Sequence, residues 1–329
     1  MNPDELLKRY TAGEVNFAEI NLRGANLAGA DLIGVNLSKA NLHSASLVFA
    51  YLTRTNLRSA ILVGAKLGGA NLNQAHLSEA NLSDADLHGA SLTGATMVNV
   101  NAALANLLDA NLIDADMRDI NLRGANLAGA CMRGANLRKE LKRSANLTGA
   151  CFHKADLRGA NFSGADLSGA DLRAANLSEA TFTGANLSGA DLTNAIMQGC
   201  FLTEANLTGA NLTAVDLANA KIERANLTDA QMEDANLAWV IMPDSKLTRA
   251  NMVNVNLMMA KLARSDFSRA NLQKANLQDA NLTEAYLART NLFGADLTNA
   301  ILSKAELSSA NLAGATMKGA TMPDGTTYS

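Results

Sequence analysis

The segments Ala25-Asn26-Leu27-Ala28-Gly29 and Ala165-Asp166-Leu167-Ser168-Gly169 are two copies of the five-residue unit that decides the fold. From residue 15 to residue 324, the 329-residue chain divides into 62 consecutive slots of this kind. The first position is Ala in 48 slots, and the third is Leu in 45. A period of five fits neither the 3.6-residue period of an α-helix nor the two-residue period of a β-strand. The sequence therefore predicts a repeat architecture.

Each position of the slot has a physical reason. Apolar residues at positions one and three point inward around an outward second position, as in a short β stretch. Of 24 Gly residues, 21 occupy position five, where a tight turn favours a positive φ. Asn or Asp at position two is suited to bonding nearby backbone. A stretch followed by a corner, repeated along the chain, predicts a coil.

This pattern resembles that of the pentapeptide-repeat proteins, and in particular bacterial members of a cyanobacterial type. The resemblance covers residues 15–324. It implies an all-β fold, a right-handed quadrilateral β-helix with four slots per coil, and hence about 15.5 coils. The third position then points inward with the first beside it, and the other three positions face outward.

The two ends of such a coil need covering. We expect residues 1–14 to form an N-terminal cap with a helix over residues 2–12, since Asn2 suits the N-cap and Pro3 the first helical position. Residues 15–324 are expected to form the β-helix, with an interruption at 140–144. The tail, 325–329, offers no helix, so the last coil is left to the tail or to another molecule.

Composition and motifs argue against several function classes. The net charge of −3 does not favour direct nucleic-acid binding. No apolar run is long enough for a membrane span, and we expect no signal peptide. Three Cys favour a reducing, cytoplasmic location. We find no catalytic, cofactor or metal-binding motif and therefore expect no enzyme and no cofactor; the four His are scattered over outward positions: His43, His76, His88 and His153.

One slot lacks a large inward side chain. Ala102 stands where most slots carry Leu. Such a replacement leaves a void that costs about 2–5 kcal/mol when nothing fills it. We expect Leu104 to turn inward and fill the space.

The strongest break in the pattern is the slot 140–144, which reads Glu-Leu-Lys-Arg-Ser. In strict phase Glu140 and Lys142 would be buried, which is costly for charged groups. We expect Leu141 to take the inward place and residues 142–144 to bulge outward. In the alternative, the whole slot loops out and every later side of the coil rotates by one.

Basic residues gather around this break. With four slots per coil, Arg118, Arg138 and Arg158 are predicted to stack on one side. Arg133, His153 and Arg173 are predicted to stack on the adjacent side. With Lys142 and Arg143, these arginines form a candidate patch for an acidic partner or phosphate groups.

Exposed apolar residues form the second candidate surface. The only Trp of the chain, Trp239, and Met259 share the same outward position one coil apart. Ile241 and Met258 lie close by in the sequence. Exposed Trp and Met side chains together are typical of a protein-docking site.

These features favour a non-enzymatic structural or protein-interaction scaffold that binds an unidentified protein through its outer faces. We expect a monomer, or weak end-to-end self-association through the C-terminal coil. The alternative is a DNA-mimicking modulator of DNA gyrase or topoisomerase, because the resemblance includes family members with that activity. A continuous negative stripe along the coil would support the alternative, and a mixed surface with an apolar patch would support the scaffold.

Overall fold

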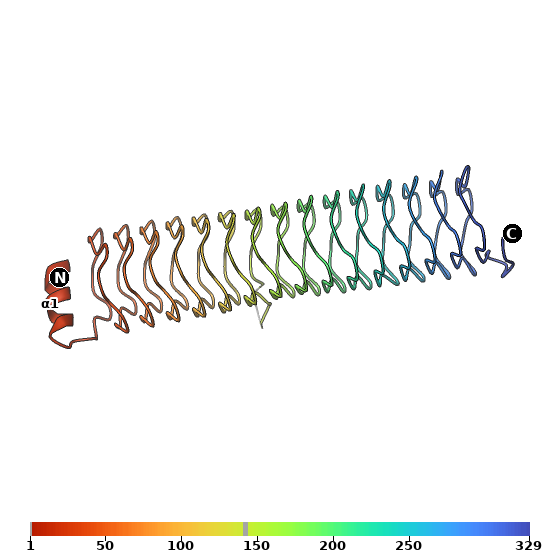
Figure 1. Ribbon diagram of the computed structural model, residues 1–329. Coiled ribbons are helices and arrows are strands. Elements are labelled where there is room, and N and C mark those ends of the chain that lie inside the picture. The colour runs from red at the N-terminus through yellow and green to blue at the C-terminus, as the bar shows by residue number, and fades with distance from the viewer. Residues whose placement is uncertain (1, 141–143) are drawn as a thin grey trace. The chain divides into compact units, whose positions relative to one another are not determined.

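The computed structural model describes residues 2–140 and 144–329 as two compact units, Met1–Asp166 and Leu167–Ser329. Each unit is a right-handed quadrilateral β-helix, as the resemblance to pentapeptide-repeat proteins implies (Figure 1). In the described residues, α1 (Pro3–Thr11) is the only helix, and the β structure consists of single-residue bridges rather than longer strands. We refer below to unit 1 and unit 2.

Parallel bridges set the size of the coil. The second position of a slot pairs with the second position of the fourth slot after it, as Asn16 pairs with Asn36 and Asp171 with Asp191. Each coil is therefore made of four slots and has four sides. Residues at the same slot position on the same side form a column, with a spacing of about 4.8 Å from coil to coil.

Each corner is a β-turn. The Leu22 carbonyl accepts a hydrogen bond from the Ala25 N–H at 3.0 Å, and the same bond recurs in most slots. The fifth position has a positive φ, for example +65° at Gly24. A positive φ at the third residue of a four-residue turn defines a type II turn. Fifth positions are therefore the corners of the coil.

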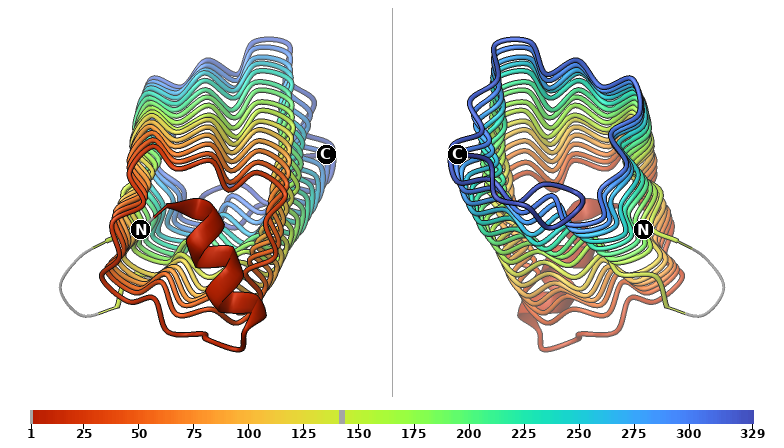
Figure 2. Two further views of the ribbon diagram at one scale, coloured as in Figure 1. Left: turned by 90° about the vertical axis from the view of Figure 1, so that its left-hand side faces the viewer. Right: turned by 90° about the vertical axis from the view of Figure 1, so that its right-hand side faces the viewer.

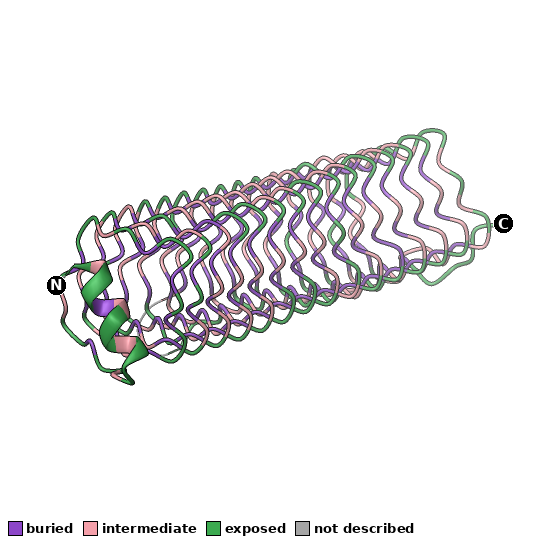
Figure 3. Cartoon of the chain, turned by 60° about the vertical axis from the view of Figure 1, so that its left-hand side comes forward, coloured by how far each residue is buried: buried purple, intermediate pink, exposed green. Residues whose placement is uncertain are grey.

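The core is the stack of first and third positions. These side chains are almost all buried, and Figure 3 shows the buried backbone positions recurring at the same places in each coil. Side-chain burial of this kind is the main favourable contribution to folding. Phe residues enter the third position without disrupting it, and Phe152 meets Phe162 edge to face at 6.5 Å.

Second-position Asn residues tie the coils together. The Asn41 Oδ1 accepts a hydrogen bond from the His43 N–H at 3.2 Å, which steadies the corner. The Asn36 Nδ2 donates to the Asn16 Oδ1 of the preceding coil at 2.8 Å, which forms an Asn ladder. The same two bonds recur along both units, so the placement of Asn in the repeat has a direct structural reason.

Helix α1 covers the first coil of unit 1, as expected from the sequence (Figure 2). The Asn2 side chain accepts a hydrogen bond from the Glu5 N–H at 2.8 Å, and Pro3 begins the helix. Leu6 is fully buried and seals the end of the core. The Tyr10 hydroxyl donates to the Ile33 carbonyl at 3.2 Å and holds the far end of the helix on the coil.

The register changes at the break in the repeat. Asn121 pairs with Asn146, five slots further on, although Asp116 still pairs with Asn136 at the usual distance of four slots. The columns after the break are therefore shifted by one slot, which is the alternative considered from the sequence. The predicted inward position of Leu141 lies outside the described residues.

The expected filling of the Ala102 site is wrong. Leu104 is 63% exposed, whereas Ala102 is fully buried. Leu104 occupies a fifth position with φ +60°, and a residue at a corner directs its side chain away from the core. One of its methyl groups, Cδ2, lies instead over Gly124 of the next coil.

The last residues of unit 2 fold back on its final coil (Figure 2). Thr321 forms an antiparallel bridge with Thr327, and the Tyr328 N–H donates to the Ala320 carbonyl at 2.8 Å. The inward residues Leu307, Leu312 and Met317 are only partly buried, unlike their counterparts in the preceding coil.

Candidate functional site

The described residues hold no group of three side chains able to bind a metal ion. A surface hollow of unit 1 is lined in part by Arg58 and Glu79, which pair with each other at 2.7 Å. That ion pair lowers the pKa of the Glu79 carboxyl and occupies both charged groups. Within the described residues, no helix has the length and apolar character that crossing a membrane requires.

The best-defined candidate site is an apolar cluster on unit 2. Trp239 and Met259 are consecutive members of one corner column, and the Trp239 N–H donates to the Met258 carbonyl at 2.9 Å. Trp239 is 51% exposed and Met259 is 37% exposed. Ile241 and Met258 are half-buried beside them. These four residues are called the Trp239 patch below; the sequence predicts them, and the structure brings them together.

The backbone at this corner is unfavourable for large side chains. Trp239 has φ +62° and Met259 has φ +56°. A left-handed conformation costs a non-glycine residue roughly 1–2 kcal/mol, which is why Gly fills so many corners of the chain. Asn219 and Asp279, at the neighbouring corners of the same column, are short polar residues that tolerate it better. The Trp239 patch therefore occupies an exposed place that the coil itself does not require to be apolar.

Lysines flank the Trp239 patch. Bridges place Ile241 in one column between Lys221 and Lys261, and both lysines are exposed. The Lys221 ammonium lies 5.2 Å from the ring centre of Phe201, one coil further back. The surroundings of the patch are thus cationic and partly aromatic.

The predicted arginine ladders are wrong, because the register changes between their members. Arg118 and Arg138 still share a column, but the Arg158 carbonyl bonds Gly134 and so brings Arg158 next to Arg133. His153 is aligned with Ala128 and Gly129 rather than with Arg133. Arg173 belongs to unit 2. Lys142 and Arg143 lie outside the described residues.

Most of these arginines already have acidic partners. Arg118 pairs with Asp116 at 2.7 Å and with Glu140 at 2.6 Å, which raises its pKa. Arg158 pairs with Asp156 at 2.7 Å, and Arg133 lies 3.6 Å from the same carboxylate. The bond from Arg158 is the main reason that the pKa of Asp156 is lowered. The region therefore offers less free positive charge than the sequence suggests.

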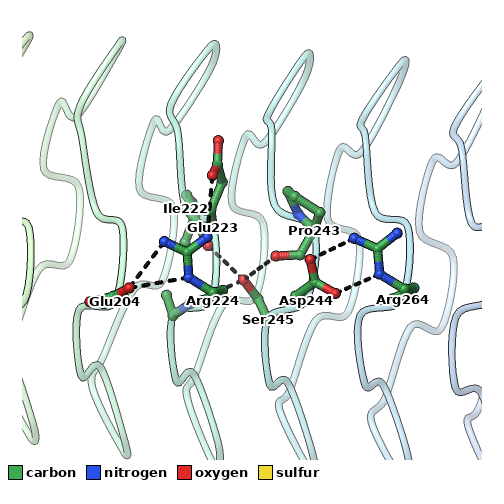
Figure 4. Close-up of polar contacts among 9 residues, drawn as sticks. Glu204, Ile222, Glu223, Arg224, Pro243, Asp244, Ser245 and Arg264 are labelled. Carbon is green, nitrogen blue, oxygen red and sulfur yellow. Dashed lines mark hydrogen bonds and ion pairs between the residues drawn. The ribbon is translucent and has the colours of Figure 1, made fainter.

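Sequence reasoning missed a ladder of alternating charge on one corner column of unit 2 (Figure 4). Arg224 pairs with Glu204 at 3.0 Å, and Arg264 pairs with Asp244 at 2.7 Å. Beyond them Lys304 lies 3.7 Å from Glu284. We call these six residues the charge ladder. In the sequence it is visible as fifth-position residues, four slots apart, whose charges alternate between negative and positive.

Buried hydroxyls reinforce the same part of unit 2. Ser245 replaces Ala at a first position and is fully buried. Its hydroxyl donates to the Ile222 carbonyl at 2.5 Å and accepts from the Ala225 N–H at 3.2 Å (Figure 4). Because the buried hydroxyl both donates and accepts a hydrogen bond, it links two coils and leaves no buried polar group unsatisfied.

These features define a solenoid whose outer surface, rather than its interior, carries the candidate sites. The profile of the family described as "Pentapeptide repeats" matches most of the chain, and the chain belongs to this family. The matched residues are 20–58, 60–99, 105–139, 143–164, 160–199, 197–229, 230–269, 250–289 and 290–324.

Several solved structures are similar to this chain. HetL, a pentapeptide repeat protein involved in heterocyst differentiation regulation from the cyanobacterium Nostoc sp. strain PCC 7120, is 29% identical over 100% of both chains, with a TM-score of 0.20. Rfr23 from the cyanobacterium Cyanothece 51142 is 28% identical over 34% of this chain and 86% of its own, with a TM-score of 0.19. Full-length QnrB1, a plasmid-mediated fluoroquinolone resistance protein, is 18% identical over 58% and 91%, with a TM-score of 0.25. No curated protein matches the chain.

Proposed function

We propose that this chain is a non-enzymatic protein-interaction scaffold of the cytoplasm, and that its protein partner docks on the Trp239 patch. The observation that carries the proposal is the position of Trp239, a half-exposed aromatic side chain at a left-handed corner. Aromatic side chains supply much of the binding energy in protein interfaces. The cytoplasmic location is supported by the three cysteines, none of which is in a disulfide, so that the fold needs no oxidising compartment.

The energetics of the corner favour a binding role. A corner residue needs only to tolerate a positive φ, and Gly or Asn does so at lower cost than Trp. Covering the exposed half of the Trp239 side chain would contribute about 2 kcal/mol. The binding energy from a docked partner would therefore offset the cost of placing Trp239 in a left-handed conformation. The described residues of the isolated coil provide no contact that does so.

The charged residues beside the Trp239 patch indicate the chemistry of its partner. Lys221 and Lys261 lie on either side of Ile241 in its column. A partner with an apolar pocket for Trp239 and acidic residues at its rim would complement both features. The arginines near the break are a weaker second surface, because Asp116, Glu140 and Asp156 already pair with Arg118, Arg133 and Arg158.

The distribution of acids favours a scaffold over a DNA mimic. A mimic of a duplex needs a continuous negative stripe along one side. The acids of the Lys- and Arg-free segment 67–117 are instead divided among all four sides of unit 1, as the bridge register assigns them: Glu79, Asp84, Asp86, Asp109, Asp114 and Asp116. In unit 2, the charge ladder mixes both signs on one corner.

End-to-end association remains a further proposal for the partly buried last coil of unit 2. Light scattering of the full chain and of a variant lacking residues 320–329 tests it. A mass above the monomer that falls on truncation supports end-to-end contact, and a monomer in both cases refutes it.

The single Trp makes the docking proposal directly measurable. The chain is used to capture proteins from a lysate of its source organism, and each captured protein is purified and titrated against it. Docking on the patch should shift Trp239 emission to shorter wavelength, since the indole leaves water. Trp239→Phe should keep most of the affinity, whereas Met259→Asn should weaken it about tenfold or more. Phe49→Asn, in unit 1, is the matched exposed-aromatic control.

A partner that binds without any change in Trp239 emission, and equally well to Met259→Asn, would remove the Trp239 patch from the proposal. Specific binding of purified gyrase would instead support the DNA-mimic alternative. Loss of binding with Phe49→Asn alone would move the docking site to unit 1.

A further inference from the structure

From residue 189 onward, one side of unit 2 separates its charges along the length of the coil. We call it the split-charge face. Bridges running from Asp191 to Asn311 place its segments in seven successive coils. Its segments are 189–194, 209–214, 229–234, 249–254, 269–274, 289–294 and 309–314.

From segment 189–194 onward, the acids and bases of this face do not mix. The preceding segment of the same side, 169–174, holds Arg173, which pairs with Asp171 at 2.7 Å and lies 3.8 Å from Asp191. All four acids of the face lie in its first three coils: Asp191, Asp229, Glu233 and Asp234. All four bases lie in the following three: Arg249, Arg269, Lys274 and Arg289. The face therefore carries a charge of −4 over residues 189–234 and +4 over residues 249–294.

Several of these charges are unpaired within the part of the chain that the structure describes. Arg249 pairs with Asp229 at 2.6 Å, but Glu233, Arg269, Lys274 and Arg289 make no ion pair there. All four are exposed. The charge ladder is different, since each of its cations has an acid of the neighbouring coil beside it. Figure 4 shows this for Arg224 and Arg264. The same coil thus satisfies its charges on one corner and leaves them available on another side.

The pattern identifies what fits this face. A polyanion such as a nucleic acid would be attracted by one half and repelled by the other. A short acidic peptide would use the basic half only. A second copy of the chain, reversed end to end, would use both halves at once. We propose that unit 2 forms a two-fold symmetric, antiparallel dimer through the split-charge face.

The columns define the pairing. The two-fold axis lies in the interface, perpendicular to the coil axis, at the level of Asn251. The corner residue Asp234 then faces Lys274 of the second copy, and Asp229 faces Arg269 of the second copy. Each contact occurs twice, as in any isologous interface. At the axis the two Arg249 side chains face each other, and each is paired with Asp229 of its own chain at 2.6 Å. A parallel arrangement would place Asp229 against Asp234, acid against acid, so the charges favour the antiparallel orientation.

Apolar residues fit the same arrangement. Val253 lies in the coil of the two-fold axis and faces its own symmetry copy. Phe293, which is 46% exposed, faces Thr213 of the second copy. The face is only one side of the coil and about 34 Å long at the spacing between coils. A narrow, charge-rich contact of this kind gives a weak dimer that salt dissociates.

Sedimentation equilibrium of the full-length chain tests the dimer at about 20 mM and about 500 mM NaCl. The wild type should dimerise at low salt and dissociate at least about tenfold more readily at high salt. Asp234→Lys and Lys274→Asp should each weaken the dimer at least about tenfold, because each creates two like-charge contacts. The double variant should recover the wild-type constant to within about threefold, since both contacts are restored with reversed sign.

Two further samples distinguish this interface from association through another surface of the coil. A 1:1 mixture of the two single variants should form a heterodimer. Lys261→Asp, on the opposite side of the coil, should leave dimerisation unchanged. A monomer at low salt and about 100 µM chain, or a dimer that neither reversal weakens, would overturn the proposal. The Trp239 patch lies on another corner, so its partner assay gives an independent result.

Discussion

Ala214 offers a direct measurement of what a corner costs. It occupies a fifth position of unit 2 with φ +54° and an exposed side chain. A left-handed conformation costs a residue with a Cβ roughly 1–2 kcal/mol, and Gly avoids that cost. Gly also loses about 0.5–1 kcal/mol through its freedom in the unfolded chain. The difference predicts that Ala214→Gly stabilises the protein by about 0.5–1 kcal/mol.

The control lies in the next slot. Ala218 is at a fourth position, outside the positive-φ set, so Ala218→Gly incurs the entropy cost without relieving the backbone. It should destabilise the protein by about 0.5–1 kcal/mol. Both variants remove one methyl group. Ala214 is exposed and Ala218 is half-buried, and the prediction rests on the positive φ that only Ala214 has.

Urea unfolding monitored by circular dichroism measures both variants. The midpoint should rise for Ala214→Gly and fall for Ala218→Gly at unchanged slope, since neither variant alters the surface exposed on unfolding. A fall in both midpoints would refute the reasoning, because the corner would then impose no cost on a side chain. The argument that Trp239 occupies an unfavourable corner would fail with it.

Other features of the structure lead to three further predictions. Deletion of residues 140–144 should change the free energy of unfolding by no more than about 1 kcal/mol, since the register passes over this slot; urea unfolding measures it, and a loss of several kcal/mol would contradict it. Ala102→Leu should raise the melting temperature by filling the inward column, with a stabilisation of about 0.5–2 kcal/mol, and a lowered melting temperature would show that the space is already closed. Burial raises the pKa of the Cys200 thiol to about 12, so iodoacetamide at neutral pH should alkylate Cys131 and Cys151 in the folded protein but not Cys200, as mass spectrometry can check.

The fold follows from the sequence because inward and corner positions have different physical demands. Ala and Leu fill a narrow interior, and Gly or Asn suits a positive φ, so the period of five is visible without an alignment. The helical cap is equally clear from Asn2 and Pro3. These features depend on local interactions, so the residues that determine them can be recognised directly in the sequence.

The arginine ladders could not be predicted in the same way. The insertion at the break has the length of one slot, so the repeat returns in phase whether the slot is inside or outside the coil. The column of every later residue nevertheless changes by one. Arg158 therefore meets Arg133 rather than Arg138, although the residue spacing suggests the reverse. The pairing of Asn121 with Asn146, and the same offset from Cys131 to Asp156, distinguish the two cases.

The charge patterns of unit 2 show a different limit. A charge count in windows along the sequence mixes all four sides of the coil. The charge ladder and the split-charge face become visible only when residues four slots apart are compared. Trp239 needed no such comparison, because it is the only Trp and stands at a corner position.

The two proposals act together through geometry. The split-charge face and the Trp239 patch lie on different parts of the same coils, so a dimer through the first leaves the second uncovered. An antiparallel dimer would present two Trp239 patches related by the two-fold axis. A partner with two docking sites at matching separation would then bind with higher avidity than one with a single site. Salt would weaken that avidity by dissociating the dimer, while the affinity of each Trp239 patch, which is largely apolar, would change much less. The salt dependence of bivalent and monovalent binding therefore separates the contribution of the dimer from that of the docking site.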